Sequence, residues 1–218
     1  MLISKYRTWV FDCDGVILDS NRVKTDAFFS AAKGYGDLAA SALVKYHVQH
    51  GGISRYAKFE YFLRHIIGRN EIDSDELERL LRAYAENVIQ GLLDCDIAEG
   101  LFELKRRTED SRWLVVSGGD QAELRKVFEA RDLSSLFDGG IFGSPANKDQ
   151  ILKRELQSGR LAQPAVFLGD SRYDYEAANR AGLDFIYLSD WSESTFSFDG
   201  ATRHAGAIRD LVDGCSAV

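Results

Sequence analysis

FDCDGVILDS, residues 11–20, places two aspartates, Asp12 and Asp14, directly behind an apolar run and ahead of a glycine. Strands disfavour aspartate and the two carboxylates repel each other, so this pair needs a cation or a proton to offset its charge. The same tripeptide recurs at Asp94-Cys95-Asp96, where a helical pattern precedes it and no glycine follows directly. We interpret the second copy as the cap of a helix over residues 98–106. Context therefore assigns function to the first pair alone.

Several short apolar runs predict strands that are buried on both faces. The predicted strands are residues 8–11, 113–116, 165–168 and 185–188, with a shorter candidate at 141–142. Between the later runs lie helical patterns at residues 120–131, 149–157 and 174–181. This alternation predicts an α/β fold with a parallel sheet and right-handed crossovers, in which sites form at the carboxyl ends of the strands.

The segment from residue 20 to residue 93 has a different pattern, because it shows amphipathic helices and no convincing strand. The helical patterns cover residues 24–32, 38–50, 54–67 and 75–92, separated by breaks that contain glycine. Asp73 or Ser74 would cap the last of these helices. We interpret residues 20–93 as a helical cap domain inserted after the first strand, and residues 1–19 and 94–218 as the α/β core domain.

The bulk composition is that of an acidic globular protein. Its 218 residues carry a net charge of -7, which argues against nucleic-acid and membrane-surface partners. The start of the chain, MLISKYRTWVFDCD, holds no apolar stretch long enough for a signal peptide or a membrane span, so we expect a cytoplasmic protein. Cys13, Cys95 and Cys215 are odd in number and lack CxxC spacing, which predicts free thiols.

Acidic side chains converge on the predicted carboxyl edge of the sheet. Asp12 and Asp14 follow the first strand, and Ser117 follows the second. Asp170 follows the third strand, with Asp174 four positions later at the start of a helix. Carboxylate oxygens suit a hard divalent cation such as Mg²⁺, which takes one or two of them together with water and substrate phosphate. The sequence therefore predicts a magnesium site at this edge.

These stretches, in this order, resemble the four motifs of the haloacid dehalogenase (HAD) superfamily. The matching stretches are Asp12-Cys13-Asp14-Gly15-Val16, Ser117, Lys148 ahead of a helix, and GDSRYDYEAANRAG at residues 169–182. More narrowly, the chain is similar to the phosphatase branch with a C1-type helical cap, which includes phosphoglycolate phosphatase-like and β-phosphoglucomutase-like proteins. The resemblance covers residues 6–20 and 94–190, and in the cap it extends only to length, position and helical pattern. It implies a Rossmannoid core with an inserted cap.

The resemblance also implies three catalytic residues. Asp12 would attack phosphorus as the nucleophile and form an aspartyl-phosphate. Asp14 would donate a proton to the leaving oxygen and later take one from water. Lys148 would hold the nucleophile and stabilise the transferring charge, as the negative charge on a transferring phosphoryl group requires.

Further residues would bind the phosphate and the metal if the resemblance holds. Ser117, Gly118 and Lys148 would bind phosphoryl oxygens, and the Ser117-Gly118-Gly119 turn before a helix suits that task. The Mg²⁺ would be bound by Asp12, by the backbone carbonyl of Asp14 and by Asp170. Asp174 would order a metal-bound water or a neighbouring group.

The predicted cap adds candidate substrate contacts. Arg55 and Lys58 follow Gly51-Gly52, where a loop over the site would present cations to an acidic substrate. A solvated helix face explains the same pattern equally well. The histidines of this segment do not have metal-ligand spacing and are interpreted as packing or surface residues: His47, His50 and His65.

We therefore expect a Mg²⁺-dependent phosphatase that hydrolyses a small phosphomonoester, such as a sugar phosphate or a phosphoglycolate-like ester, as a monomer or homodimer. A phosphomutase of the β-phosphoglucomutase type would share the nucleophile and the cap. A dehalogenase would use Asp12 on carbon and would not require Asp14 or a metal. A non-catalytic binding protein on the same fold would not require the two first-motif aspartates and the lysine together.

Overall fold

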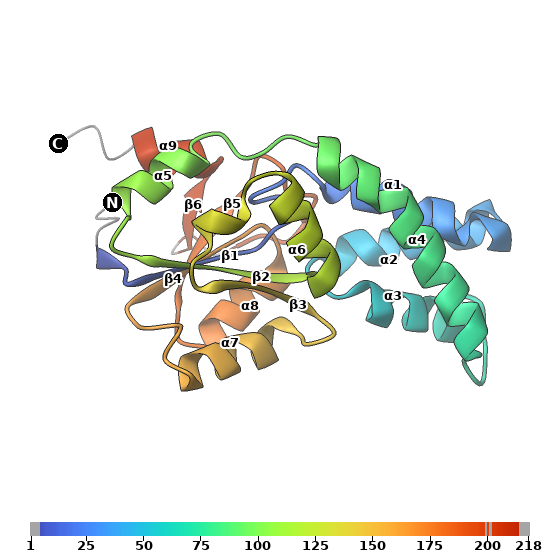
Figure 1. Cartoon of the computed structure of the whole chain (residues 1–218). Coiled ribbons are helices and arrows are strands. Elements are labelled where there is room, and N and C mark those ends of the chain that lie inside the picture. The colour runs from blue at the N-terminus through green and yellow to red at the C-terminus, as the bar shows by residue number, and fades with distance from the viewer. Residues whose placement is uncertain (1–4, 199, 201, 214–218) are drawn as a thin grey trace.

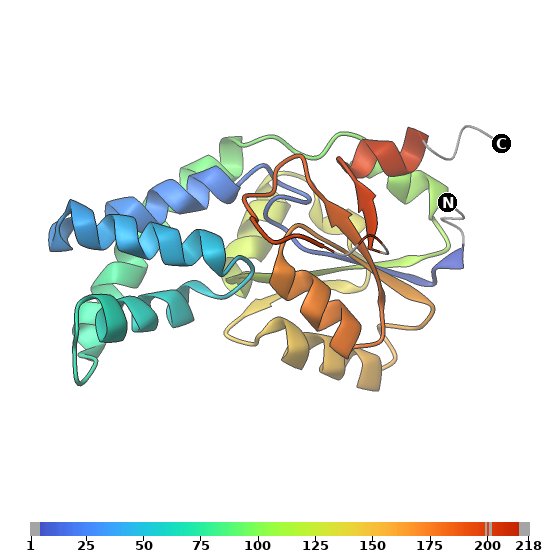
Figure 2. The same ribbon diagram turned by 180° about the vertical axis from the view of Figure 1, so that it is seen from behind.

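The computed structural model describes residues 5–198, 200 and 202–213 (Figures 1 and 2). These residues contain a six-stranded sheet of order β3-β2-β1-β4-β5-β6, in which all neighbouring strands are parallel. The strands are β1 (Thr8–Phe11), β2 (Arg112–Asp120), β3 (Gly140–Ser144), β4 (Ala165–Gly169), β5 (Asp184–Leu188) and β6 (Arg203–Ala205). The α/β fold class and the five predicted strands are confirmed. Strand β6 is a sixth that the apolar pattern did not indicate.

Strand β2 is longer than its apolar run. The pattern ended the strand at Val116, whereas β2 continues through Ser117 and two glycines to Asp120. After a shift in register, Asp120 pairs with Ser144 of β3. The Asp120 carboxylate then accepts a hydrogen bond of 3.0 Å from the Glu123 backbone N–H and caps the following helix. The predicted phosphate turn is therefore the end of a strand.

Helices cover both faces of the sheet. The core helices are α5 (Leu101–Arg107), α6 (Gln121–Ala130), α7 (Lys148–Gln157), α8 (Arg172–Arg180) and α9 (Ile208–Asp213), with the short 3₁₀ turn η4 (Ser134–Leu136). In Figure 1, α7 and α8 lie below the sheet and α5, α6 and α9 above it. Successive β1 residues alternate between the two sides: Trp9 and Phe11 pack in the upper cluster and Val10 in the lower one.

The remaining helices lie together at the end of the sheet to which β1 leads (Figures 1 and 2). They are α1 (Asn21–Ala32), η2 (Lys33–Tyr35), α2 (Asp37–Gln49), α3 (Arg55–Tyr61), its π-helical continuation η3 (Phe62–Ile66), and α4 (Ser74–Asp94). Phe28 joins them, with its ring centroid 5.2 Å from that of Phe59 and 4.5 Å from that of Tyr84. The predicted helical character is confirmed, while the division into a cap (20–93) and a core remains a prediction.

The second aspartate tripeptide does not cap a helix, so that prediction is wrong. Asp94 is the last residue of α4, and α5 begins only at Leu101, behind Gly100. Gly100 has a φ of 82° and lies against the backbone of Arg209, which only glycine tolerates. The Asp96 carbonyl instead accepts a hydrogen bond of 2.9 Å from the Asp19 backbone N–H.

Three smaller predictions can be compared with the structure. Asp73 caps α4 by accepting a hydrogen bond of 2.9 Å from the Asp75 backbone N–H, as predicted. Cys13 and Cys95 are free thiols, also as predicted, and Cys215 lies outside the described residues. Among the helices of the described part of the chain, none combines the length and the apolar character that spanning a bilayer requires.

Candidate active site

Asp12 lies where the strand order reverses, with β2 on one side of β1 and β4 on the other. Its backbone N–H donates to the Leu168 carbonyl at 2.9 Å and ties the end of β1 to β4. The Cys13 backbone N–H donates to Oδ1 of Asp12 at 2.7 Å, and Lys148 Nζ lies 2.9 Å from Oδ2. Both oxygens of this buried carboxylate are therefore fixed in direction.

Lys148 is fully buried between two carboxylates, those of Asp12 and Asp174. It is the first residue of α7, where Asn147 and Gln150 form a capping box that fixes the start of the helix. Burial lowers the pKa of Lys148, but the two carboxylates outweigh burial and hold this pKa above its ordinary value. The lysine therefore keeps its positive charge beside Asp12.

Three buried carboxylates, those of Asp12, Asp170 and Asp174, offer oxygen atoms that all lie within 4.8 Å of one another. Asn21 Nδ2 donates to Asp170 at 2.7 Å. Ser171 donates to Asp174 through its backbone N–H at 3.1 Å and through its hydroxyl at 2.6 Å. Asp174 thus holds both Lys148 and the start of α8.

The charge balance of this group favours a bound cation. Burial raises the pKa of Asp12 to about 7, and Asp174 adds to the rise while Lys148 opposes it. Burial, together with Asp174 and Asp12, raises the pKa of Asp170 well above its ordinary value. One lysine therefore does not offset three buried carboxylates. The donors are all oxygen, which is the ligand set of a hard metal cation.

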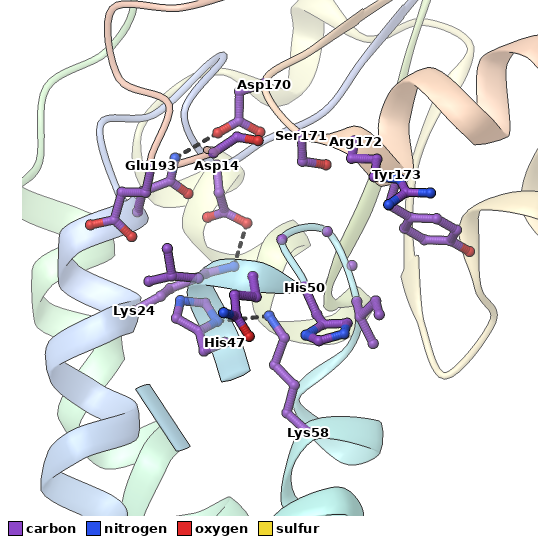
Figure 3. Close-up of a pocket in the computed structure, with 18 of the residues that line it drawn as sticks. Asp14, Lys24, His47, His50, Lys58, Asp170, Ser171, Arg172, Tyr173 and Glu193 are labelled. Atoms are coloured by element: carbon purple, nitrogen blue, oxygen red, sulfur yellow. Dashed lines mark hydrogen bonds and ion pairs between the residues drawn. The ribbon is translucent and has the colours of Figure 1, made fainter. Parts of the chain in front are cut away.

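Asp14 faces a different partner. Its carboxylate accepts a hydrogen bond of 2.6 Å from the Ser20 hydroxyl and forms an ion pair with Lys24 of α1 (Figure 3). Burial raises the pKa of Asp14, but Lys24 and the two hydrogen bonds outweigh burial and bring this pKa below its ordinary value. The Asp14 side chain is therefore an ionised group outside the cluster of three carboxylates.

Glycines let the loops of the site approach closely. Gly15 has a φ of 72°, and a β-carbon there would collide with the side chains of Asp170 and Asn21. A β-carbon on Gly118 would collide with the carbonyl of Gly52, so the loop between α2 and α3 touches the end of β2. Ser117 is fully buried beside this contact, and its Oγ accepts a hydrogen bond of 3.0 Å from the Gly119 backbone N–H.

A cavity of about 470 Å³ opens between these loops and the helices α1 to α4. Asp12, Asp14, Asp170 and Gly118 line it from the sheet side. From the helical side it is lined by Lys24, Phe28, His47, Arg55, Lys58 and Tyr84. The carboxylates therefore open into a space that can hold a small organic molecule.

Both predicted cap cations line this cavity, and neither lies on a solvated helix face. The two terminal nitrogens of Arg55 donate to Glu123 of α6, one of them at 3.0 Å, and the guanidinium lies 4.5 Å from the centroid of the Tyr84 ring. Lys58 is 2% exposed, and its Nζ lies 2.7 Å from Nδ1 of His47 (Figure 3). Arg55 therefore ties α3 to α6.

A family model for haloacid dehalogenase-like hydrolases matches residues 6–182. The chain belongs to the haloacid dehalogenase-like hydrolase family. The resemblance drawn from the four motifs is therefore confirmed. No curated protein matches the chain.

Solved structures of the same fold include phosphatases and a mutase. One is a predicted phosphoglycolate phosphatase from Haemophilus somnus, with a TM-score of 0.74 and 16% identity over 97% of this chain and 98% of that one. Another is a predicted phosphatase from Clostridium acetobutylicum, with a TM-score of 0.73 and 18% identity over 99% and 100% of the two chains. The β-phosphoglucomutase of Clostridium difficile has a TM-score of 0.69 and 17% identity over 94% and 92%. At these identities the likeness shows the shared fold.

Two residues of α1 in this HAD-like hydrolase contact the motif aspartates without having been predicted for the site. Lys24 was placed only at the start of a cap helix, yet it pairs with Asp14, and Asn21 one turn earlier reaches Asp170. The sequence feature that could have predicted these contacts is the helical register that begins at Ser20. Ser20 and Lys24 are four residues apart, so they lie on one helix face, and both contact Asp14. His47 contacts the Phe28 ring at 4.5 Å, as expected of a packing histidine.

Proposed function

We propose that this HAD-like hydrolase is a Mg²⁺-dependent phosphatase that cleaves a small phosphomonoester through an aspartyl-phosphate on Asp12. The observation that carries the proposal is the buried group of Asp12, Lys148 and Asp170. The Asp12 carboxylate is held in a fixed direction beside a charged lysine, and Asp12 and Asp170 line a cavity. That arrangement suits attack on phosphorus, because a carboxylate and a phosphate dianion repel each other and nearby positive charge must offset this repulsion.

Attack by Asp12 would form an oxygen–phosphorus bond and break the ester bond. Lys148 and the Cys13 backbone N–H each hold one carboxylate oxygen, so the nucleophile loses little orientational freedom during the step. We assign Ser117 and Gly118 to the phosphoryl oxygens. Lys148 would stay charged throughout, because the Asp174 carboxylate pairs with it in addition to Asp12.

Asp14 would serve first as the acid and then as the base. In the structure it is ionised and paired with Lys24 and Ser20, which is the state needed to take a proton from the water that hydrolyses the aspartyl-phosphate. Before the first step it must carry a proton for the leaving oxygen. The approach of a phosphate dianion raises the pKa of a neighbouring carboxyl and so favours that state.

The metal site would be formed by Asp12, Asp170 and the backbone carbonyl of Asp14. A bound Mg²⁺ would neutralise charge on the phosphoryl oxygens. Asp174 is engaged by Lys148 and by Ser171, so we assign it to holding these neighbours in place. Asn21 would orient the Asp170 carboxylate.

Magnesium should stabilise the metal-free protein and EDTA should abolish turnover. At a Mg²⁺ concentration a hundred times Kd, linkage gives about 2.7 kcal/mol, which is roughly 5–10 °C in Tm for a chain of this size. Because the pKa values of Asp12 and Asp170 are raised, protons compete with the cation at low pH. The shift measured by thermal unfolding should therefore be larger at pH 8 than at pH 6.

The Asp170→Asn variant should lose this Mg²⁺-dependent shift. Asp26→Asn, an exposed change on α1, should keep it and serves as the matched control. A shift of wild-type size in Asp170→Asn would contradict the assignment of the metal site, and turnover that survives EDTA would favour the dehalogenase reaction.

A broad panel of phosphate esters with Mg²⁺, assayed by phosphate release and by product analysis, tests the function. We expect stoichiometric inorganic phosphate and the free alcohol. An isomeric sugar phosphate formed without phosphate release would instead show the phosphomutase reaction, which the same fold carries out in the Clostridium difficile β-phosphoglucomutase.

A further inference from the structure

Lys58 differs from the other cations that line the cavity. Lys24 pairs with Asp14, Arg55 with Glu123, and Arg172 with Glu176 at 2.7 Å. Of the lysines and arginines lining the cavity in the described part of the chain, Lys58 alone has no carboxylate within ion-pair distance. Its hydrogen-bond partner is the imidazole of His47.

His47 does not supply the missing negative charge. Burial, together with Lys58 and Lys24, lowers the pKa of His47 well below its ordinary value, so the ring is neutral and Nδ1 accepts from the lysine. Burial and the nearby Lys24 and Lys148 lower the pKa of Lys58 to about 7, although Asp14 and Asp12 oppose this. An ammonium in this position is costly until an anion arrives.

The position of Lys58 suits a group of the substrate other than the reacting phosphate. In Figure 3 the Asp14–Lys24 pair lies between Asp170 and Lys58, which approach the cavity from opposite sides. The rings of Phe28 and Tyr84 line the cavity on the helical side as well, so water screens the lysine poorly there.

We propose that Lys58, backed by His47, binds a second negatively charged group of the substrate, so that the substrate class is a phosphomonoester with a further carboxylate or phosphate. This inference rests on the proposed phosphatase function. The second anion would pair with Lys58, which has no carboxylate partner among the described residues, and a neutral sugar phosphate would leave this cation without one. A charge-assisted hydrogen bond in a buried site also discriminates strongly against a substrate that lacks the acceptor.

Matched pairs of substrates test the inference directly. Phosphoglycolate, 3-phosphoglycerate and 6-phosphogluconate would each be compared with the neutral ester of the same chain length, namely 2-hydroxyethyl phosphate, glycerol 1-phosphate and glucitol 6-phosphate. Fructose 1,6-bisphosphate against fructose 6-phosphate distinguishes a second phosphate from a carboxylate. We expect kcat/KM for at least one ester with a second anionic group to exceed, at least tenfold, the value for the matched ester that lacks this group.

The Lys58→Met variant should reduce that preference ratio at least tenfold. Lys58→Arg keeps the charge and should retain most of the preference. Lys45→Met makes the same change at an exposed position of α2, the helix that carries His47, and should leave the ratio at its wild-type value. Circular dichroism and thermal unfolding of each variant establish that it is folded.

The wild-type pH profile tests the inference without any variant. The preference ratio should fall as pH rises from 6 to 8.5, by up to tenfold per unit above the pKa of about 7, because the anion binds the protonated amine. The charged or titratable groups around the amine are Lys24, His47, Asp14, Asp12 and Lys148. Titrations of the catalytic groups affect both members of a substrate pair, so the ratio cancels them.

The outcomes separate the two proposals. Hydrolysis without any preference for the anionic partner, or a preference that Lys58→Met and rising pH leave unchanged, overturns the inference and leaves the phosphatase proposal standing. If no ester of either kind releases phosphate, the proposed function falls and the inference falls with it.

Discussion

In the Asp12→Asn variant, phosphate release should fall by about 10⁴-fold or more, the scale expected when a covalent nucleophile is removed. The amide is nearly isosteric with the carboxylate, so the Cys13 backbone N–H can still donate to the side-chain oxygen. Lys148 keeps its second partner, Asp174, and the buried site therefore retains a paired cation. The loss should appear in kcat, measured by phosphate release at saturating ester with Mg²⁺.

The chain provides its own control for this change. Asp94→Asn alters the first aspartate of the same tripeptide at an exposed helix end, and it should leave kcat within about twofold of wild type because surface changes away from a site have little effect. An Asp12→Asn variant with wild-type kcat would exclude the aspartyl-phosphate. If Asp12→Asn and the wild-type protein show the same near-zero turnover, and each binds a protein partner, the result would support the non-catalytic alternative.

The sheet was predictable from the sequence because its strands are buried on both faces and therefore appear as uninterrupted apolar runs. The end of β2 was not predictable from the sequence, since Ser117, Gly118 and Gly119 have the composition of a turn. What keeps them in the strand is pairing of Asp120 with Ser144 across a register shift, a contact between segments that the local pattern does not connect.

The site residues that follow strands were placed correctly at one edge, as the three-carboxylate group shows for Asp12 and Asp170. Residues that reach the site from a helix face were harder to predict. Lys24 and Asn21 reach the aspartates from α1, and Arg55 meets its partner Glu123 across 68 residues of chain. Tertiary packing decides such pairs, and no short motif carries it.

The tripeptide sequence alone does not distinguish the two Asp-Cys-Asp segments, because it is the same in both. The first copy follows directly after β1 and the second begins at the last residue of α4, but only the first is followed by a glycine, Gly15, which lies against Asp170 at the end of β4. The preceding strand and the following glycine distinguished the first copy in the sequence. In the structure, that glycine is the residue that lets the loop approach Asp170. The prediction for the second copy was wrong because the N-cap residue of the following helix is Gly100, and neither aspartate of the tripeptide caps it.

Replacing Lys148 with methionine should destabilise the metal-free protein strongly. Lys148 is the cation between the buried Asp12 and Asp174, and removing one partner from a buried ion pair costs about 3–5 kcal/mol. That is a large part of the 5–15 kcal/mol by which domains are typically stable. Urea unfolding in EDTA, followed by circular dichroism at pH 8, should show the loss as a lower midpoint with an unchanged slope.

The deficit should shrink as the pH falls. Without the lysine, the folded-state pKa of Asp12 rises further above its unfolded value of about 4. A carboxyl with a raised folded pKa destabilises the protein as pH rises through the interval between the two values, and protonation at lower pH removes the penalty. The difference between Lys148→Met and wild type should therefore be smaller at pH 5.5 than at pH 8.

Two further variants determine whether buried charge is the cause. Lys153→Met changes an exposed lysine of the same helix and should alter the free energy of unfolding by less than about 0.5 kcal/mol. Asp174→Asn combined with Lys148→Met removes one of the carboxylates left unpaired, so the double variant should be more stable than Lys148→Met alone. If Lys148→Met is as stable as wild type at both pH values, the lysine does not stabilise these carboxylates, and Asp12 is not held ionised in the way that the catalytic proposal requires.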